Sequence, residues 1–173
     1  MKSLQSDDFE LFGLAQRFEQ DRAELDARWK DLQRQAHPDK FADQGAASQR
    51  IAMQWSVRIN EAYQRLKDPL KRAAYLCELH GAPVNAENNT AMPPAFLMQQ
   101  MEWREELDEA QSAEDLQKIS QQVQQARRSM LQNIERLIDT QQAFAEAVAQ
   151  VRALMFVERF EEDVNTRLDQ IET

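Results

Sequence analysis

The residues best suited to chemistry lie in one short segment, His37-Pro38-Asp39-Lys40. Pro38 cannot continue a helix and restricts the residue before it, so the segment must end the preceding helix in a rigid turn. Cationic residues flank this turn on the helix that leads into it: Arg28, Lys30 and Arg34. An ordinary helix-ending turn with a solvated helix face beside it would use the same residue types. A group of cationic residues beside an exposed turn is also typical of a docking surface, on which charge sets the register and the association rate of the partner.

Cys77 and His80 have the residue types of metal ligands and lie three apart on an expected helix. Two ligands do not close a zinc site, which takes four, and no third ligand is evident. Three widely spaced glycines cannot build a phosphate-binding loop. We therefore expect no metal, no cofactor and no catalytic residue. A carboxylate-dependent enzyme stays formally open, because the chain has 30 acidic side chains.

The composition narrows the class of protein further. The 173 residues carry 21 basic and 30 acidic side chains, and this net charge of −9 argues against nucleic-acid binding. Only three glycines and five prolines argue against strand-rich folds. No run approaches the roughly 18 apolar residues that would cross a membrane. A single cysteine and a start without a signal peptide predict a reducing cytoplasm. The sequence does not reveal the oligomeric state, and a monomer is the default expectation.

The charge is unevenly distributed along the chain. Residues 1–80 carry 13 basic and 13 acidic side chains, whereas residues 81–173 carry 8 and 17. Between these halves, the segment from Gly81 to Pro94 is rich in asparagine and proline, which is typical of a linker. We predict a first domain over residues 1–80, a linker over 81–93 and a second domain over 94–173.

Apolar spacing predicts that the first half is helical. Asp7-Asp8 can cap a short first helix. A second helix is expected from about Asp21 to Ala36, because its apolar residues recur every three or four positions. Ser48 is the expected N-cap of a third helix that ends before Asp68-Pro69, and a fourth helix should run from Pro69 to Gly81.

The second half is expected to form a three-helix bundle, so the predicted fold class is all-α. Its helices should run from Pro94 to Ala110, from a cap at Ser112, and from about Gln141 to the end. The first of these has more apolar residues than one face needs. A core stripe is expected from Phe96, Trp103, Leu107 and Ala110.

A second apolar stripe on that helix is formed by Leu97 and Met101, about 100° round from the first. Charged residues continue and border it, among them Glu102, Arg104 and Glu105. Exposed apolar groups with a charged rim mark partner sites. A three-helix bundle also buries wide helix faces. Periodicity alone is therefore also consistent with Leu97 and Met101 being core residues.

The arrangement of helix, His-Pro-Asp and helix resembles a J domain, the module that activates DnaK-class chaperone ATPases. The segment Gln33–Phe41 is similar more narrowly to the HscB family, the J co-chaperones of iron–sulfur cluster biogenesis. Phe96-Leu97-Met98 and the segment Arg104–Glu109 extend this resemblance, which covers nearly the whole chain and is loose in the final helix. The chain lacks the cysteine pairs of some eukaryotic relatives.

The resemblance implies a co-chaperone that stimulates the ATPase of an HscA-type chaperone and delivers to it the iron–sulfur scaffold protein IscU. Residues implied to bind the chaperone are His37, Pro38, Asp39, Lys40, Arg28, Lys30 and Arg34. Residues implied to bind the scaffold are Leu97, Met101, Glu102, Arg104, Glu105 and Phe156. The alternative is a helical adaptor that scaffolds other proteins without activating a chaperone.

Overall fold

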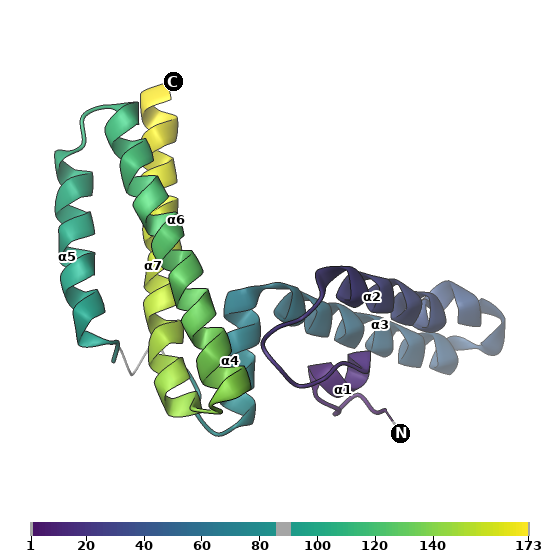
Figure 1. Cartoon of the computed structure of the whole chain (residues 1–173). Coiled ribbons are helices and arrows are strands. Elements are labelled where there is room, and N and C mark those ends of the chain that lie inside the picture. The colour runs from purple at the N-terminus through teal and green to yellow at the C-terminus, as the bar shows by residue number, and fades with distance from the viewer. Residues whose placement is uncertain (1, 86–90, 173) are drawn as a thin grey trace. The chain divides into compact units, whose positions relative to one another are not determined.

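The computed structural model describes residues 2–85 and 91–172, and every regular element in these residues is a helix (Figure 1). The chain divides into two compact units, Met1–Leu76 and Cys77–Thr173. The domain boundaries predicted from the sequence stay a prediction, since part of the predicted linker, residues 86–90, lies outside the described residues. No helix in the described parts of the chain is long and apolar enough to cross a membrane.

The first unit is built around two antiparallel helices, α2 (Arg22–Ala36) and α3 (Ala46–Lys67), which lie side by side (Figure 1). The short α1 (Asp8–Phe12) packs against both, and α4 (Pro69–Leu79) follows α3. Apolar side chains of α1, α2 and α3 meet in the core of this unit, where the fully buried members include Phe9, Phe12, Leu25, Ile59 and Leu66.

The connection between α2 and α3 is more regular than predicted. Pro38–Gln44 form a 3₁₀ segment, and α3 begins after Gly45, which adopts a φ of 95° that side-chain-bearing residues avoid. The expected N-cap Ser48 was therefore wrong, because that residue lies inside the helix. Asp7 caps α1, as expected, and Asp21, the predicted start of the second helix, caps α2.

A buried carboxylate ties α1 to α3, and its burial was not predicted. Asp8 is fully buried, and its two oxygens lie 2.8 Å from Arg58 Nη2 and 2.6 Å from Arg65 Nε. Arg58 also donates to the backbone carbonyls of Leu4 and Ser6. The hydrogen bonds to Asp8 raise the pKa of Arg65. This cluster fixes the N-terminal segment on α3.

The second unit contains the predicted three-helix bundle of α5 (Pro94–Glu109), α6 (Ala113–Glu135) and α7 (Phe144–Glu172) (Figure 1). Ser112 caps α6, as predicted, and its hydroxyl accepts from the Asp115 N–H at 3.1 Å. The last helix starts at Phe144, three residues later than expected. Arg136–Thr140, which follow α6 directly, form a π-helical turn.

Aromatic rings join α5 to α7 in the core of the bundle. The Trp103 ring stacks on Phe160 with centroids 5.7 Å apart, and Phe96 meets Phe156 edge to face at 5.8 Å. Arg167 on α7 donates to the backbone carbonyls of Leu107 and Ala110 at the end of α5, at 3.1 and 3.0 Å. These contacts fix which face of α5 is turned inward.

Candidate protein-binding sites

The His-Pro-Asp turn is exposed and held in shape by its own residues. His37 ends α2, and its Nδ1 accepts a hydrogen bond from the Asp39 N–H at 3.2 Å. Pro38 occupies the first position of the 3₁₀ segment, where its missing N–H costs nothing. The Asp39 side chain is 94% exposed and that of His37 is 56% exposed. The turn therefore presents a carboxylate to solvent from an ordered backbone.

Lys30 and Arg34 lie on the same side of α2 as His37, at intervals of four and three residues. A shallow hollow beside them is lined by Trp29, Lys30, Gln33, Arg34 and His37. Trp29 and Gln33 were not expected at this site. Both are held by α3, because Trp29 Nε1 and Gln33 Nε2 donate to Asn60 Oδ1 at 3.0 and 2.7 Å.

Arg28 is placed differently from the other predicted cations. Its Nη1 donates to the carbonyls of Phe12 and Gly13, each at 2.9 Å, and its Nη2 lies 2.7 Å from Glu24 Oε1. Gly13 has a φ of 65°, and a Cβ there would come within 2.8 Å of Arg28 Nη1. Arg28 thus ties α2 to the end of α1, and the structure does not bring it to the turn.

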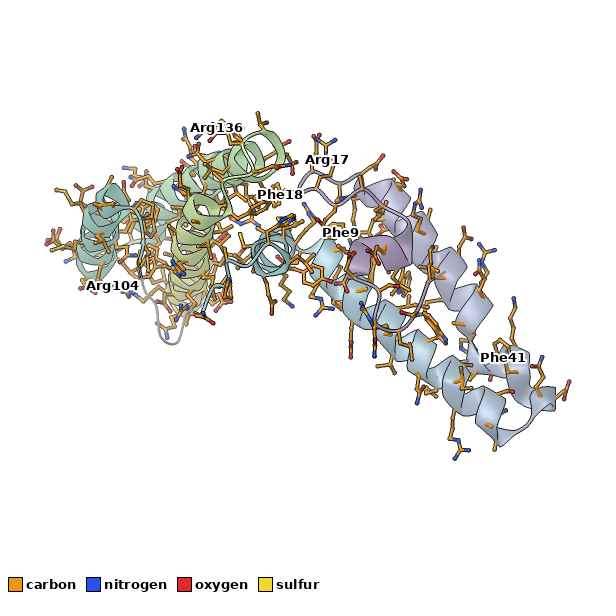
Figure 2. The ribbon with its side chains drawn as sticks, turned by 90° about the horizontal axis from the view of Figure 1, so that it is seen from below. Phe9, Arg17, Phe18, Phe41, Arg104 and Arg136 are labelled. Carbon is orange, nitrogen blue, oxygen red and sulfur yellow. The ribbon has the colours of Figure 1, made fainter. Side chains whose placement is uncertain are left out.

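We call Lys30, Arg34, His37, Pro38, Asp39 and Lys40 the turn face. Arg34 forms an ion pair with Asp31, one turn earlier on α2, while Lys30 and Lys40 are exposed. The end of the α2–α3 pair that carries this turn is marked by Phe41 in Figure 2.

The helix α5 has one buried and one exposed apolar face. Phe96, Trp103 and Leu107 are buried, as the sequence predicted. Leu97 is 48% exposed and Met101 is 67% exposed, so neither is a core residue. Met98, which the sequence analysis did not select, is 68% exposed on the same side. A helical wheel would have placed Met98 on the exposed side, since it lies about 160° round the helix from the buried Phe96.

Two residues predicted for this surface also contact α7, Arg104 with a half-exposed side chain and Phe156 with a partly buried one. Arg104 lies 3.5 Å from Asp163 of α7, and its guanidinium is 5.3 Å from the Phe160 ring centroid. Figure 2 labels Arg104 on its helix. Phe156 is partly buried and packs between the rings of Phe96 and Phe160.

We call the exposed side of this helix, formed by Leu97, Met98, Met101, Glu102 and Glu105, the α5 outer face. The two methionines and the leucine form an apolar area near the start of the helix, and the carboxylates continue it. Acidic residues dominate the rest of the helix, where Arg104 is the single cation.

Cys77 and His80 have structural roles in the second unit. The Cys77 thiol is buried 3.9 Å from the Phe144 carbonyl, and burial raises its pKa to about 11. The His80 ring stacks on the Phe144 ring with centroids 3.9 Å apart. A protonated, buried thiol and a stacked imidazole are poor ligands. These contacts favour packing over metal binding for this pair.

An exposed His-Pro-Asp turn on an antiparallel helix pair, together with a three-helix bundle, defines a J-domain protein with a C-terminal helical domain. Residues 92–165 match the family model described as "HSCB C-terminal oligomerisation domain". The chain is 48% identical over its full length to the "Co-chaperone protein HscB homolog" of Burkholderia multivorans, of which it covers 100%. It is 49% identical to that of Burkholderia mallei, with 99% of each chain covered. The chain belongs to the HscB co-chaperone family.

Solved structures agree with this assignment. "Chaperone HscB from Vibrio cholerae" superposes with a TM-score of 0.83 at 36% identity, over 96% of this chain and 99% of that one. The human co-chaperone protein HscB gives 0.85 at 28% identity, over 96% and 84%. The Jac1 co-chaperone of Saccharomyces cerevisiae, at 20% identity with a TM-score of 0.72, shows the shared fold.

These findings confirm the predicted family and the all-α fold class of a J domain with a helical bundle. They also confirm the coarse function, that of a co-chaperone in iron–sulfur cluster assembly, and disfavour the adaptor alternative. Members of the family regulate other proteins and are not enzymes.

Proposed function

We propose that this co-chaperone stimulates the ATPase of an HscA-type chaperone through its turn face and presents an IscU-type scaffold protein on its α5 outer face. The observation that carries the proposal is the exposed Asp39 carboxylate on a backbone already ordered by His37 and Pro38. The chain itself hydrolyses nothing in this mechanism. It acts by preferring one conformation of the ATP-bound chaperone and shifting the population toward it.

The turn face suits an arginine-bearing partner. An exposed carboxylate can accept two parallel hydrogen bonds from a guanidinium, a geometry that fixes orientation as well as supplying energy. Because the His37 cap already orders the turn, binding costs little additional backbone entropy. Lys30 and Arg34 lie beside the turn and favour approach to an acidic surface on the same partner.

The α5 outer face suits a different kind of partner. Leu97, Met98 and Met101 offer about one helical turn of exposed apolar side chains, and methionine adapts its shape to irregular pockets. Glu102 and Glu105 border these side chains with negative charge. A scaffold protein with an apolar pocket rimmed by basic residues would complement this face. Arg104, which is half exposed beside Asp163, borders this face, and Phe156 supports α5 from within the bundle.

One chain with two surfaces explains how a scaffold is delivered. A scaffold bound on α5 is tethered to a chaperone bound at the turn face, which raises the effective concentration of one for the other. The predicted division into residues 1–80, 81–93 and 94–173 supplies a linker for this tether. We also propose that the protein acts as a monomer in the cytoplasm, without cofactor or metal.

Two aspartates of the 3₁₀ segment provide a matched test. Asp39→Asn should remove most of the stimulation of a purified HscA-type ATPase in single-turnover assays, because the amide accepts an arginine fork poorly. Asp43→Asn changes the same residue type in the same exposed segment and should stimulate like the unaltered protein. Full stimulation by Asp39→Asn would refute the turn-face mechanism.

A further inference from the structure

The α5 outer face carries the most exposed methionines of the described chain. Met98 and Met101 are 68% and 67% exposed and lie three residues apart, so their thioethers share one side of α5. Met53, on α3, is 53% exposed, and the described methionines Met92, Met130 and Met155 are partly buried.

An exposed thioether reacts with a peroxide in a balanced two-electron step. A sulfur lone pair attacks one peroxide oxygen, an S–O bond forms, and the O–O bond breaks. The sulfur is oxidised to a sulfoxide, the peroxide is reduced, and the departing hydroxide gains a proton to leave as water. Exposure sets how readily each methionine reacts, and methionine sulfoxide reductases reverse the product.

We propose that Met98 and Met101 are sites of reversible oxidation by peroxides, and that their sulfoxides weaken docking of the scaffold protein on α5. The proposal rests on the scaffold-binding function proposed above for this face. A sulfoxide oxygen is a strong hydrogen-bond acceptor that must lose water when the face is covered, which is unfavourable without a donor.

The neighbouring side chains of the α5 outer face cannot supply that donor. Glu102 and Glu105 carry carboxylates, which accept hydrogen bonds and do not donate them. Arg104, the single cation of α5, is turned toward Asp163 and the Phe160 ring. The oxidised face therefore loses apolar contact area and gains a polar group for which Glu102 and Glu105 supply no hydrogen-bond donor.

Oxidation at these positions leaves the bundle intact. The side chains that hold α5 in place point to the opposite side of the helix, where Phe96, Trp103 and Leu107 are buried. The turn face belongs to the other compact unit. The oxidised protein should therefore keep its fold and its direct stimulation of the chaperone while it loses the scaffold.

The test uses the full chain, hydrogen peroxide as oxidant and the metal-free scaffold protein as titrant. Peptide mass spectrometry measures the oxidation of each methionine, and calorimetry measures the dissociation constant before and after treatment. Once Met98 and Met101 are oxidised, we expect the dissociation constant to rise about tenfold or more. Treatment with methionine sulfoxide reductases of both stereospecificities should restore it.

Three variants separate oxidation at α5 from other effects of peroxide. Met98→Leu with Met101→Leu keeps an apolar face without a thioether, so peroxide should leave the dissociation constant of this variant at its own untreated value. Met98→Gln with Met101→Gln places polar groups there permanently and should bind weakly without peroxide. Met53→Leu removes the exposed methionine of the other unit and should stay sensitive.

Unchanged scaffold affinity after complete oxidation of both residues would overturn the oxidation proposal and leave the docking function standing. Sensitivity that persists in the double leucine variant would overturn it as well. If the reduced, unaltered protein does not bind the scaffold, the function proposed for α5 fails, and the oxidation proposal fails with it.

Discussion

The turn face and the α5 outer face are both exposed, but their side chains are held in different ways. At the turn, a proline, a side-chain cap and contacts from α3 fix the polar groups before any partner arrives. On α5, long flexible side chains project from the helix with their apolar ends exposed to solvent. One protein can thus combine a preorganised polar site with an adaptable apolar one.

This difference in organisation predicts a difference in response to mutation. A preorganised polar turn fails when one group is lost, because its geometry depends on each member. An adaptable apolar patch weakens in proportion to the contact area removed. Three sets of substitutions test this contrast, and a fourth tests the structural role of Arg28.

The largest effect is expected at His37. His37→Gln removes the imidazole Nδ1 that accepts from the Asp39 N–H, so the turn loses its cap and the Asp39 carboxylate loses its fixed position. Stimulation of the HscA-type ATPase should be abolished, while circular dichroism, thermal melting and scaffold affinity stay close to those of the unaltered protein. Loss of scaffold affinity in this variant would show that the two surfaces are not independent.

A smaller and graded effect is expected on α5. Leu97→Ala with Met101→Ala should weaken scaffold binding by ~2 kcal/mol or more in titration calorimetry, and each single change by less. Both side chains are exposed, so the melting temperature should hardly change. Met53→Ala with Val57→Ala is a matched control, since these residues are exposed apolar groups on α3. Equal weakening by the control pair would argue against a specific site on α5.

The smallest effect is expected from the cations of α2. Lys30→Ala and Arg34→Ala should each slow association with the chaperone by about twofold to fivefold at low salt, and by less at high salt, because exposed charges act mainly on approach. Stopped-flow mixing across a salt series measures this.

Arg28→Ala should act differently. It removes the hydrogen bonds to the Phe12 and Gly13 carbonyls and should lower the stability of the first unit by about 1–2 kcal/mol, measured by denaturant unfolding. A slowed, salt-dependent association with unchanged stability would place Arg28 with the other two cations instead.

Much of the helical architecture follows from the spacing of apolar residues and from capping side chains. The positions of Ser112 and Pro69 marked helix starts correctly, because caps act through local backbone geometry. The start of α3 was misplaced, since serine is a good cap in general but Gly45 supplies the backbone turn that this chain uses. The π-helical turn before α7 had no local signal.

The candidate sites were predictable in position but less so in side-chain direction. Periodicity identifies which residues share a helix face, and it placed Leu97 and Met101 on a separate stripe. It does not tell where a long side chain ends. Arg28 and Arg104 reach partners 15 and 59 positions away in sequence, and such contacts depend on the tertiary fold. Asp8 is buried for the same reason.

The attachment of α5 to α7 has a consequence for how this family can diversify. Stacked rings and the Arg167 hydrogen bonds secure the helix entirely from its inner side. Substitutions on its outer side can therefore change which partner binds without lowering the stability of the bundle. A lineage could retune which scaffold it accepts, one surface residue at a time, without passing through unstable intermediates.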